Sequence, residues 1–275
     1  CKAMTAGHGT VAVMTFEPLP QAFFRPEHAP ARLSTVRQKL MLLDAAGVDL
    51  VWMMRFGAEL AGLPARQFVQ QALVNGLGAT GVVVGEDFRF GRGREGDVAL
   101  LWDLGREFGF EVSTVAAVEL NGERISSSGI RKHLACGDFE GAARFLGRPF
   151  SMEGHVVRGA QLGRKLGFPT ANLKIRACPS PLQGVFAVRS RIGEGPWLPG
   201  VSNLGWRPVV DGKEPLLEVH FFDFEQDIYG QRLEVRFVAK LRDELNFDSM
   251  DDLVDQMNID AEQARACLAE TKTPD

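Results

Sequence analysis

The spacing of hydrophobic and polar positions changes near residue 147, and each side of that point predicts a different architecture. Before it, short apolar runs alternate with longer segments whose apolar residues recur at helical spacing. Strands are predicted at 11–16, 50–55, 81–85 and 111–115, and helices near 34–46, 65–77, 97–109, 127–135 and 138–146. Ser34 and Asp97 are expected to cap the helices that they precede. This α/β order predicts a parallel sheet with helices on both faces.

Helical spacing nearly disappears after Gly147-Arg148-Pro149. Short extended runs separated by glycine and proline follow at 152–157, 184–191, 216–222 and 233–237. They predict an antiparallel barrel or sandwich. The last segment, about 249–269, is predicted to form a single helix that packs against this barrel or sandwich. Its apolar stripe consists of Met250, Leu253, Met257 and Ala261. We therefore expect two domains, residues 1–146 and 147–275.

Composition and charge narrow the class of protein. The 275 residues are 45% hydrophobic and 24% charged, which excludes a chain that is mainly disordered. The net charge of -4 provides no overall basic field, so we expect no nucleic acid partner. No apolar run approaches the roughly 18 residues of a membrane-spanning helix, so no membrane association is expected. The four cysteines stand far apart in the sequence, which favours a reducing cytoplasm.

The loop after the predicted strand 81–85 has two candidate functions. Its G-x-G-x-x-G run consists of Gly91, Gly93 and Gly96 and is one feature of a dinucleotide-binding oxidoreductase. These glycines lie several positions beyond the strand, however, and not in the first tight turn, where that motif binds the pyrophosphate. Asp97 at the start of the next helix would also repel a pyrophosphate. The three arginines of the loop suit an anionic ligand better, and a solvated loop explains them equally well. They are Arg89, Arg92 and Arg94.

Two further segments suit phosphate. Ser126-Ser127-Ser128 stands at a predicted helix N-terminus, where free N–H groups favour anions, although simple capping also explains a serine there. The segment 158–172 combines three glycines with three cations, as phosphate-cradling loops do, without the spacing of a P-loop. Thr170 and Asn172 alternate in an extended stretch, so their oxygens can share one side and hold Mg²⁺, or only stabilise a turn.

A carboxylate on a predicted strand is a candidate general base. In 216–222, Leu217, Val219 and Phe221 share one face while Glu218 and His220 share the other. A fixed carboxylate can accept a proton from a substrate hydroxyl, whereas on an open outer face both polar side chains would only meet water. The run 15–20 follows the first strand, at the edge where parallel sheets bind ligands, and its prolines can also simply end that strand.

These segments together resemble the bifunctional bacterial riboflavin kinase/FAD synthetase family, also called FMN adenylyltransferase. The resemblance spans nearly the whole chain, with its motifs in the family's order. They are T-F-E-P at 15–18, G-x-D-F-x-F-G at 85–91, S-S-S-x-I-R at 126–131, G-F-P-T-A-N at 167–172, L-E-V-H at 217–220, D-I-Y-G at 227–230 and K-L-R-D-E at 240–244. The resemblance implies a Rossmann-like nucleotidyltransferase domain followed by a small kinase barrel. Riboflavin and ATP would give FMN, and FMN and ATP would give FAD, both with Mg²⁺.

In the kinase half, the resemblance implies roles for individual residues. Glu218 would take the proton from the ribityl hydroxyl, and Thr170 and Asn172 would bind Mg²⁺ and the ATP phosphates. The nucleotide loop would contain Gly159, Gly163 and Arg164. The flavin would be bordered by Arg242 and Phe247. This assignment suits phosphoryl transfer, which depends on positioning and charge neutralisation.

In the adenylyltransferase half, the resemblance implies a flavin site and a phosphate site. The flavin site would be formed by Phe16, Pro18, Asp87 and Phe88. The phosphate site would be formed by Ser126 and Arg131.

The chain departs from the family pattern at two places. Family members carry a G-x-F-D-G-x-H-x-G-H segment before the strand that matches 11–16, whereas this chain begins with Cys1 and lacks that segment. We interpret this as the missing front of a longer protein and expect adenylyl transfer to be impaired. Val209 stands where the family usually has threonine, and its role is unassigned. A catalytically silent flavin-binding protein is the further alternative.

Overall fold

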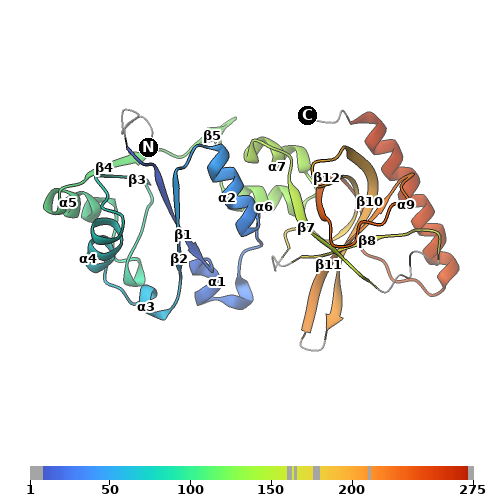
Figure 1. Cartoon of the computed structure of the whole chain (residues 1–275), viewed down its shortest axis with the longest axis horizontal. Coiled ribbons are helices and arrows are strands. Elements are labelled where there is room, and N and C mark those ends of the chain that lie inside the picture. Colours follow the sequence, from blue (N-terminus) through green and yellow to red (C-terminus); the bar gives the residue numbers. More distant parts are fainter. Residues whose placement is uncertain (1–8, 160–162, 164–165, 176–179, 210–211, 272–275) are drawn as a thin grey trace. The chain divides into compact units, whose positions relative to one another are not determined.

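The computed structural model describes residues 9–159, 163, 166–175, 180–209 and 212–271 (Figure 1). The chain divides into two compact units. The first unit contains the residues up to Pro30 together with Val36–Arg124. The second contains Ala31–Thr35 and the residues from Ile125 onward.

The first unit is built on short parallel strands. β1 (Ala12–Glu17) pairs in parallel with β2 (Leu50–Arg55), and β3 (Gly81–Gly85) pairs in parallel with β4 (Glu111–Val115). The predicted strands and their parallel direction are therefore confirmed, and they form two parallel pairs. A small antiparallel hairpin follows, made of β5 (Glu119–Leu120) and β6 (Glu123–Arg124).

Helices connect and cover these strands. They are α1 (Pro20–Phe24), α2 (Val36–Ala45), α3 (Ala58–Ala61), α4 (Ala65–Phe68) and α5 (Val98–Phe108), with 3-10 turns η1 (Pro26–His28) and η3 (Arg92–Arg94) and a π-helical continuation of α4, η2 (Val69–Gly76). Asp97 caps α5 as predicted, because its side chain accepts a hydrogen bond from Leu100 N–H at 2.9 Å. The predicted cap at Ser34 is wrong. Helix α2 begins at Val36, so Thr35 precedes it, and the Thr35 hydroxyl donates to Glu153.

The second unit is a closed antiparallel barrel, as expected. Its strands are β7 (Ser151–Val157), β8 (Ala171–Lys174), β9 (Gly184–Ile192), β10 (Trp197–Val209), β11 (Gly212–Phe221) and β12 (Arg232–Arg242). They close in the order β10-β11-β8-β7-β12-β9. The pattern of apolar runs did not predict β10, because Pro199, Gly200 and Gly205 interrupt its alternation.

Two helices pack into the core of the barrel. α6 (Ser127–Ala135) and α7 (Phe139–Leu146) contribute Leu134 and Ala142 to the same buried cluster as Leu217 and Val219 of β11. These helices therefore belong structurally with the barrel, although residues up to 146 were expected to serve the first domain. The functional boundary at residue 147 stays a prediction.

The C-terminal helix α9 (Met250–Glu270) runs along the outside of the barrel (Figure 1). Ser249 caps it by accepting a hydrogen bond from Asp252 N–H at 3.1 Å. Ala264 and Leu268 are buried in a cluster with strand residues such as Val185. Helix α9 is therefore fixed to the barrel mainly through its C-terminal half. Within the described part of the chain, no helix has the length and apolar character that crossing a membrane requires.

Candidate active site

Three polar residues are aligned across adjacent strands of the barrel. Glu218 on β11 pairs with Asn172 on β8 on one side and with Asn203 on β10 on the other. Directly opposed residues of antiparallel strands project to the same face, so the carboxylate lies between two amides. This face is the outer one, because Leu217 and Val219 on either side of Glu218 are fully buried in the core.

A cavity of about 290 Å³ lies over this face. Its wall is formed by Gly163, residues 166–170, strands β9 to β11, the end of β12 with the segment that follows it, and helix α9. Its polar lining is Thr170, Ser202, Asn203, Glu218, His220, Arg242, Glu244 and Asp260, and the remainder is Gly163, Leu166, Phe168, Val185, Val201, Leu245, Phe247, Leu253 and Met257. The interpretation that Glu218 and His220 lie on an open face is therefore wrong.

The structure brings together most of the residues predicted for the kinase half. Thr170, Glu218, Arg242, Phe247 and Gly163 all line the cavity, although they come from distant parts of the sequence. Gly163 forms a tight turn, because its carbonyl oxygen accepts hydrogen bonds from the N–H groups of residues 166 and 168. Arg164 lies outside the described residues.

Asn172 is buried beside this cavity with one polar atom unsatisfied. It is 5% exposed, and its Nδ2 donates to the carbonyl oxygen of Thr170 at 3.3 Å. Its Oδ1 has no hydrogen-bond partner among the described residues. Gly159 packs against this amide so closely that a β-carbon there would lie 2.6 Å from Asn172 Oδ1. A buried acceptor without a donor is costly, so it indicates a group that the described residues do not supply.

His220 lies at the edge of the same cavity. Its Nδ1 lies 3.0 Å from the carbonyl oxygen of Pro169, so this nitrogen carries the hydrogen. Burial lowers the pKa of His220 below its ordinary value of 6.5, and the charge of Arg265 lowers this pKa further. The hydrogen bond to Pro169 and the charge of Asp223 oppose this lowering. The ring therefore serves as a neutral element that connects β11 to the loop before β8.

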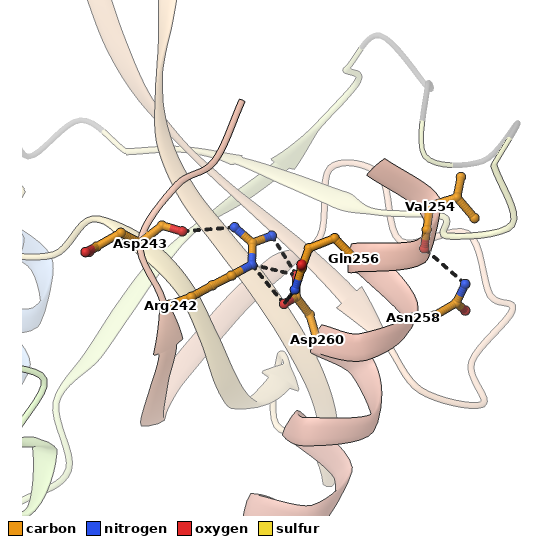
Figure 2. A network of polar contacts seen from close by, with 6 residues as sticks. All are labelled: Arg242, Asp243, Val254, Gln256, Asn258 and Asp260. Carbon is orange, nitrogen blue, oxygen red and sulfur yellow. Dashed lines mark hydrogen bonds and ion pairs between the residues drawn. The ribbon is translucent and has the colours of Figure 1, made fainter. Parts of the chain in front are cut away.

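Arg242 is held by a carboxylate on helix α9. Its Nη2 lies 2.7 Å from Asp260 Oδ2 and its Nε 2.9 Å from Asp260 Oδ1 (Figure 2). The guanidinium also lies 5.9 Å from the centre of the Phe247 ring, within the range of a cation–π contact. The two residues predicted to border a flavin therefore contact each other at one end of the cavity.

Sequence reasoning missed Asn203 and Asp260. The position of Asn203 beside Glu218 depends on strand β10, which the pattern of apolar runs did not predict. Asp260 lies inside a helical pattern with many acidic residues, so its side chain carries no distinguishing local signal. Only its burial, at 3% exposed, distinguishes it from these neighbours.

The residues predicted for the adenylyltransferase half lie in both units. In the first unit, Phe16 lies near the end of β1 and packs edge-on against Phe56 at 5.7 Å between ring centres. Pro18 follows that strand. Asp87 and Phe88 follow β3, where Phe88 stacks on Phe90 at 5.5 Å and Asp87 forms an ion pair with Arg124 at 2.7 Å. That hydrogen bond and the guanidinium charge lower the pKa of Asp87.

The predicted phosphate-binding residues belong to the second unit. Ser126 caps helix α6, because its hydroxyl accepts a hydrogen bond from Gly129 N–H at 3.0 Å. Arg131 Nε donates to the carbonyl oxygen of Ala31 at 2.6 Å, and burial lowers the pKa of its guanidinium. Both residues thus have structural contacts here, and their phosphate-binding roles stay predictions.

The glycine run in the first unit has a packing role. Phe90 and Gly96 form an antiparallel bridge that closes the loop, and a β-carbon on Gly96 would lie 2.7 Å from the Phe90 ring. A β-carbon on Gly91 would lie 2.5 Å from the α-carbon of Ala65. Close packing therefore explains Gly91 and Gly96 without a dinucleotide, and the positive φ of Gly93 explains the third glycine, so this geometry does not favour the oxidoreductase alternative. Arg89 forms an exposed ion pair with Asp97 at 3.4 Å.

Two protein-family models match successive parts of this chain. Residues 2–129 match the family described as FAD synthetase, and residues 146–268 match the family described as riboflavin kinase. Together with the parallel α/β unit and the barrel, these matches define a two-part transferase that acts on flavins and uses ATP.

Curated relatives match nearly the whole chain. A bifunctional riboflavin kinase/FMN adenylyltransferase of Escherichia coli (strain K12) is 44% identical over 95% of this chain and 84% of its own length. Its counterpart from Haemophilus influenzae is 43% identical over 93% of this chain and 83% of its own length. This chain belongs to the bifunctional riboflavin kinase/FMN adenylyltransferase family, which confirms the resemblance and both transferase activities.

A solved structure has the same fold over nearly the whole chain. A crystal structure described as a macrolide-efflux protein from Streptococcus pneumoniae is 31% identical to this chain and superposes with a TM-score of 0.77. The match covers 96% of this chain and 86% of that one.

Proposed function

We propose that the barrel cavity is the riboflavin kinase site and that Glu218 is its general base. The observation that carries this proposal is the alignment of Glu218 with Asn172 across β11 and β8. It sets a carboxylate in a cavity beside a buried amide oxygen without a hydrogen-bond partner among the described residues. A proton acceptor and a candidate ligand for the cation of a nucleotide are thus supplied from neighbouring strands.

The reaction at this site transfers the γ-phosphoryl group of ATP to the terminal ribityl hydroxyl of riboflavin. The hydroxyl oxygen forms a bond to the γ-phosphorus, and the bond from that phosphorus to the β,γ-bridging oxygen breaks. Glu218 accepts the hydroxyl proton, and the products are FMN and ADP. Because the transition state is stabilised mainly by positioning and charge neutralisation, the base has only to reach the hydroxyl.

The residues around Asn172 fit Mg²⁺ as the cation of the nucleotide. Mg²⁺ prefers oxygen ligands and retains several waters. Asn172 Oδ1, which has no partner among the described residues, would hold it together with an oxygen of Thr170, and the close packing of Gly159 fixes the position of the amide. When bound, Mg²⁺ neutralises charge on the phosphates. The ATP phosphates would follow Gly159 and Gly163, with Arg164 as a further cation of this loop.

The apolar wall fits the flavin ring system. Phe247, Leu253 and Met257 provide an apolar surface on the side of helix α9, and Arg242 supplies a positive charge at its edge. A pocket that is largely apolar with a few fixed polar groups suits a planar heteroaromatic ligand. The ribityl chain would then extend from this wall toward Glu218.

For FMN adenylyl transfer, we propose the roles expected from the resemblance. Phe16 and Pro18 lie at the carboxyl end of β1, and Asp87 and Phe88 follow the carboxyl end of β3. Such strand ends are where open parallel sheets bind ligands. Ser126 and Arg131 are proposed to contact the phosphates.

We also propose a cytoplasmic location and small-molecule partners only. The described cysteines, Cys136 and Cys267, are free thiols, and a reducing compartment preserves free thiols.

Product analysis tests the kinase proposal directly. The purified chain is incubated with riboflavin and ATP, with and without Mg²⁺, and FMN and FAD are separated by chromatography. We expect FMN only when Mg²⁺ is present. Riboflavin binding without FMN formation would support the alternative of a flavin-binding protein without catalytic activity. NADH binding would support the oxidoreductase alternative. A second incubation with FMN and ATP measures FAD formation.

A further inference from the structure

We propose that Asp260 is a positioning residue for riboflavin, acting through Arg242. This inference rests on the kinase site proposed above. Asp260 lies on helix α9 and is 3% exposed, whereas Arg242 ends strand β12. The two residues form a bidentate pair whose three donor–acceptor distances are 2.7, 2.9 and 3.2 Å (Figure 2).

The polar contacts of Asp260 and Arg242 extend to both sides of the pair. Gln256 Nε2, one turn earlier on α9, donates to Asp260 Oδ1 at 3.0 Å. On the other side, Arg242 Nη1 donates to the carbonyl oxygen of Asp243 at 2.9 Å. Figure 2 shows the guanidinium between the helix and the segment that follows β12. One carboxylate therefore links α9, the end of β12 and the loop that leads to Phe247.

The attachment of α9 to the barrel differs between its two halves. The C-terminal half buries Ala264 and Leu268, and Arg189 donates to the carbonyl oxygen of Leu268 at 2.7 Å. No residue of α9 before Asp260 is buried, although Leu253 and Met257 line the cavity. Asp260 is thus the first buried residue of the helix, three positions after Met257. It fixes the half of α9 that forms the proposed flavin wall.

Loss of the Asp260 charge should therefore affect flavin binding more than chemistry. A partly buried guanidinium that loses its carboxylate no longer has a defined position, and the cation–π contact with Phe247 is lost with it. Glu218 and Asn172 lie on other strands, β11 and β8, and neither is among the hydrogen-bond partners of this pair in the described part of the chain. The effect should appear in the KM for riboflavin, with a much smaller effect on kcat.

The test compares Asp260→Asn with a matched control on the same helix. In the control, Asp223→Asn removes the carboxylate that pairs with Arg265 of α9 at 3.1 Å, where the Asp223 side chain is 82% exposed. For Asp260→Asn we expect the KM and Kd for riboflavin to rise about tenfold or more, with kcat and the KM for ATP changed less than about threefold. Asp223→Asn should leave all four values near those of the wild type. An unchanged KM for riboflavin in Asp260→Asn would overturn the proposal, even if its Tm fell.

Hydrogen exchange tests the same residue without any substrate. In Asp260→Asn, amides of residues 250–258 should exchange faster, while those of 261–268 stay protected. Equal changes in both halves, or none, would refute the positioning role. If Asp260→Asn does not fold, Gln256→Leu is used, which removes the hydrogen bond from Gln256 to Asp260. It should raise the KM for riboflavin and not kcat, as Asp260→Asn does, but by a smaller factor. If the wild type forms no FMN, the proposed function fails, and hydrogen exchange alone decides the role of Asp260.

Discussion

Gly159 and Asn172 pack so closely that a β-carbon on Gly159 would lie 2.6 Å from the Oδ1 atom of Asn172. This oxygen is the buried acceptor that lacks a partner among the described residues, and Asn172 lies opposite Glu218 in the barrel. The absence of a side chain at position 159 therefore determines where the amide can lie. The relationship links the glycine-rich loop to the proposed catalytic residue.

Gly159→Ala should impair FMN formation by displacing the Asn172 amide. We expect kcat/KM for ATP to fall about tenfold or more, because small displacements of a positioned group strongly reduce catalysis. Gly154→Ala on β7 is the matched control, since its β-carbon would meet only ordinary contacts, the nearest at 3.6 Å from Leu173. Steady-state kinetics at varied ATP would measure both variants. Equal rates for the two would show that the amide position does not matter.

Glu218→Gln should abolish most of the turnover while it preserves binding. The amide cannot accept the ribityl proton, so kcat should fall by about 10²–10⁴-fold. The Kd for riboflavin, measured by quenching of flavin fluorescence, should stay within about twofold of the wild type, because the side chain keeps its size. Glu225→Gln, an exposed glutamate after β11, serves as the control. A turnover close to that of wild type would exclude Glu218 as the base.

The stability of the protein should decrease in mildly acidic solution because of His220. Its folded-state pKa is lowered from 6.5, mainly by burial, so the unfolded chain binds the proton more readily. The stabilising contribution of the neutral ring is complete above the unfolded pKa and is lost as the pH falls through 6.5 toward the lower folded pKa. Urea unfolding between about pH 7.5 and 5.5 should show a shallower pH dependence for His220→Gln than for wild type. Identical slopes would contradict this assignment.

Gly91→Ala should destabilise the first unit more than Gly93→Ala. Both residues have positive φ, so alanine is strained at either position, by about 1–3 kcal/mol. Gly93 is left-handed helical (φ 60°, ψ 14°), whereas Gly91 (φ 74°, ψ 177°) lies in a region that is essentially restricted to glycine, so its strain is the larger. Only at Gly91 would the new β-carbon also meet backbone, 2.5 Å from the Ala65 α-carbon, whereas Gly93 has open space. Overpacking should add about 1–3 kcal/mol at Gly91, measurable as a lower midpoint in thermal or urea unfolding. Equal losses would indicate that the conformation of the loop, and not its packing, requires glycine.

Local pattern predicted much of the fold because the period of a strand or helix is a property of the backbone itself. The predicted strands 50–55, 81–85 and 111–115 coincide with β2, β3 and β4, and the predicted helix 249–269 differs from α9 by one residue at each end. The alternation in β11 likewise placed Leu217 and Val219 in the core and Glu218 on the other face. In each case the signal lies within a few neighbouring residues.

The sequence by itself therefore determined the elements, the family motifs and the face that Glu218 occupies. Only the tertiary structure decided that Asn203 lies beside Glu218, that Asp260 holds Arg242, and that α6 and α7 pack into the core of the barrel. Strand β10 is interrupted by proline and glycine, so its alternation was obscured although its pairing with β9 and β11 is extensive. Even between these consecutive strands, a pairing such as Asn203 with Glu218 joins residues that lie outside any single strand. The energy of such a pairing depends on burial and closure of the chain, which no local period records.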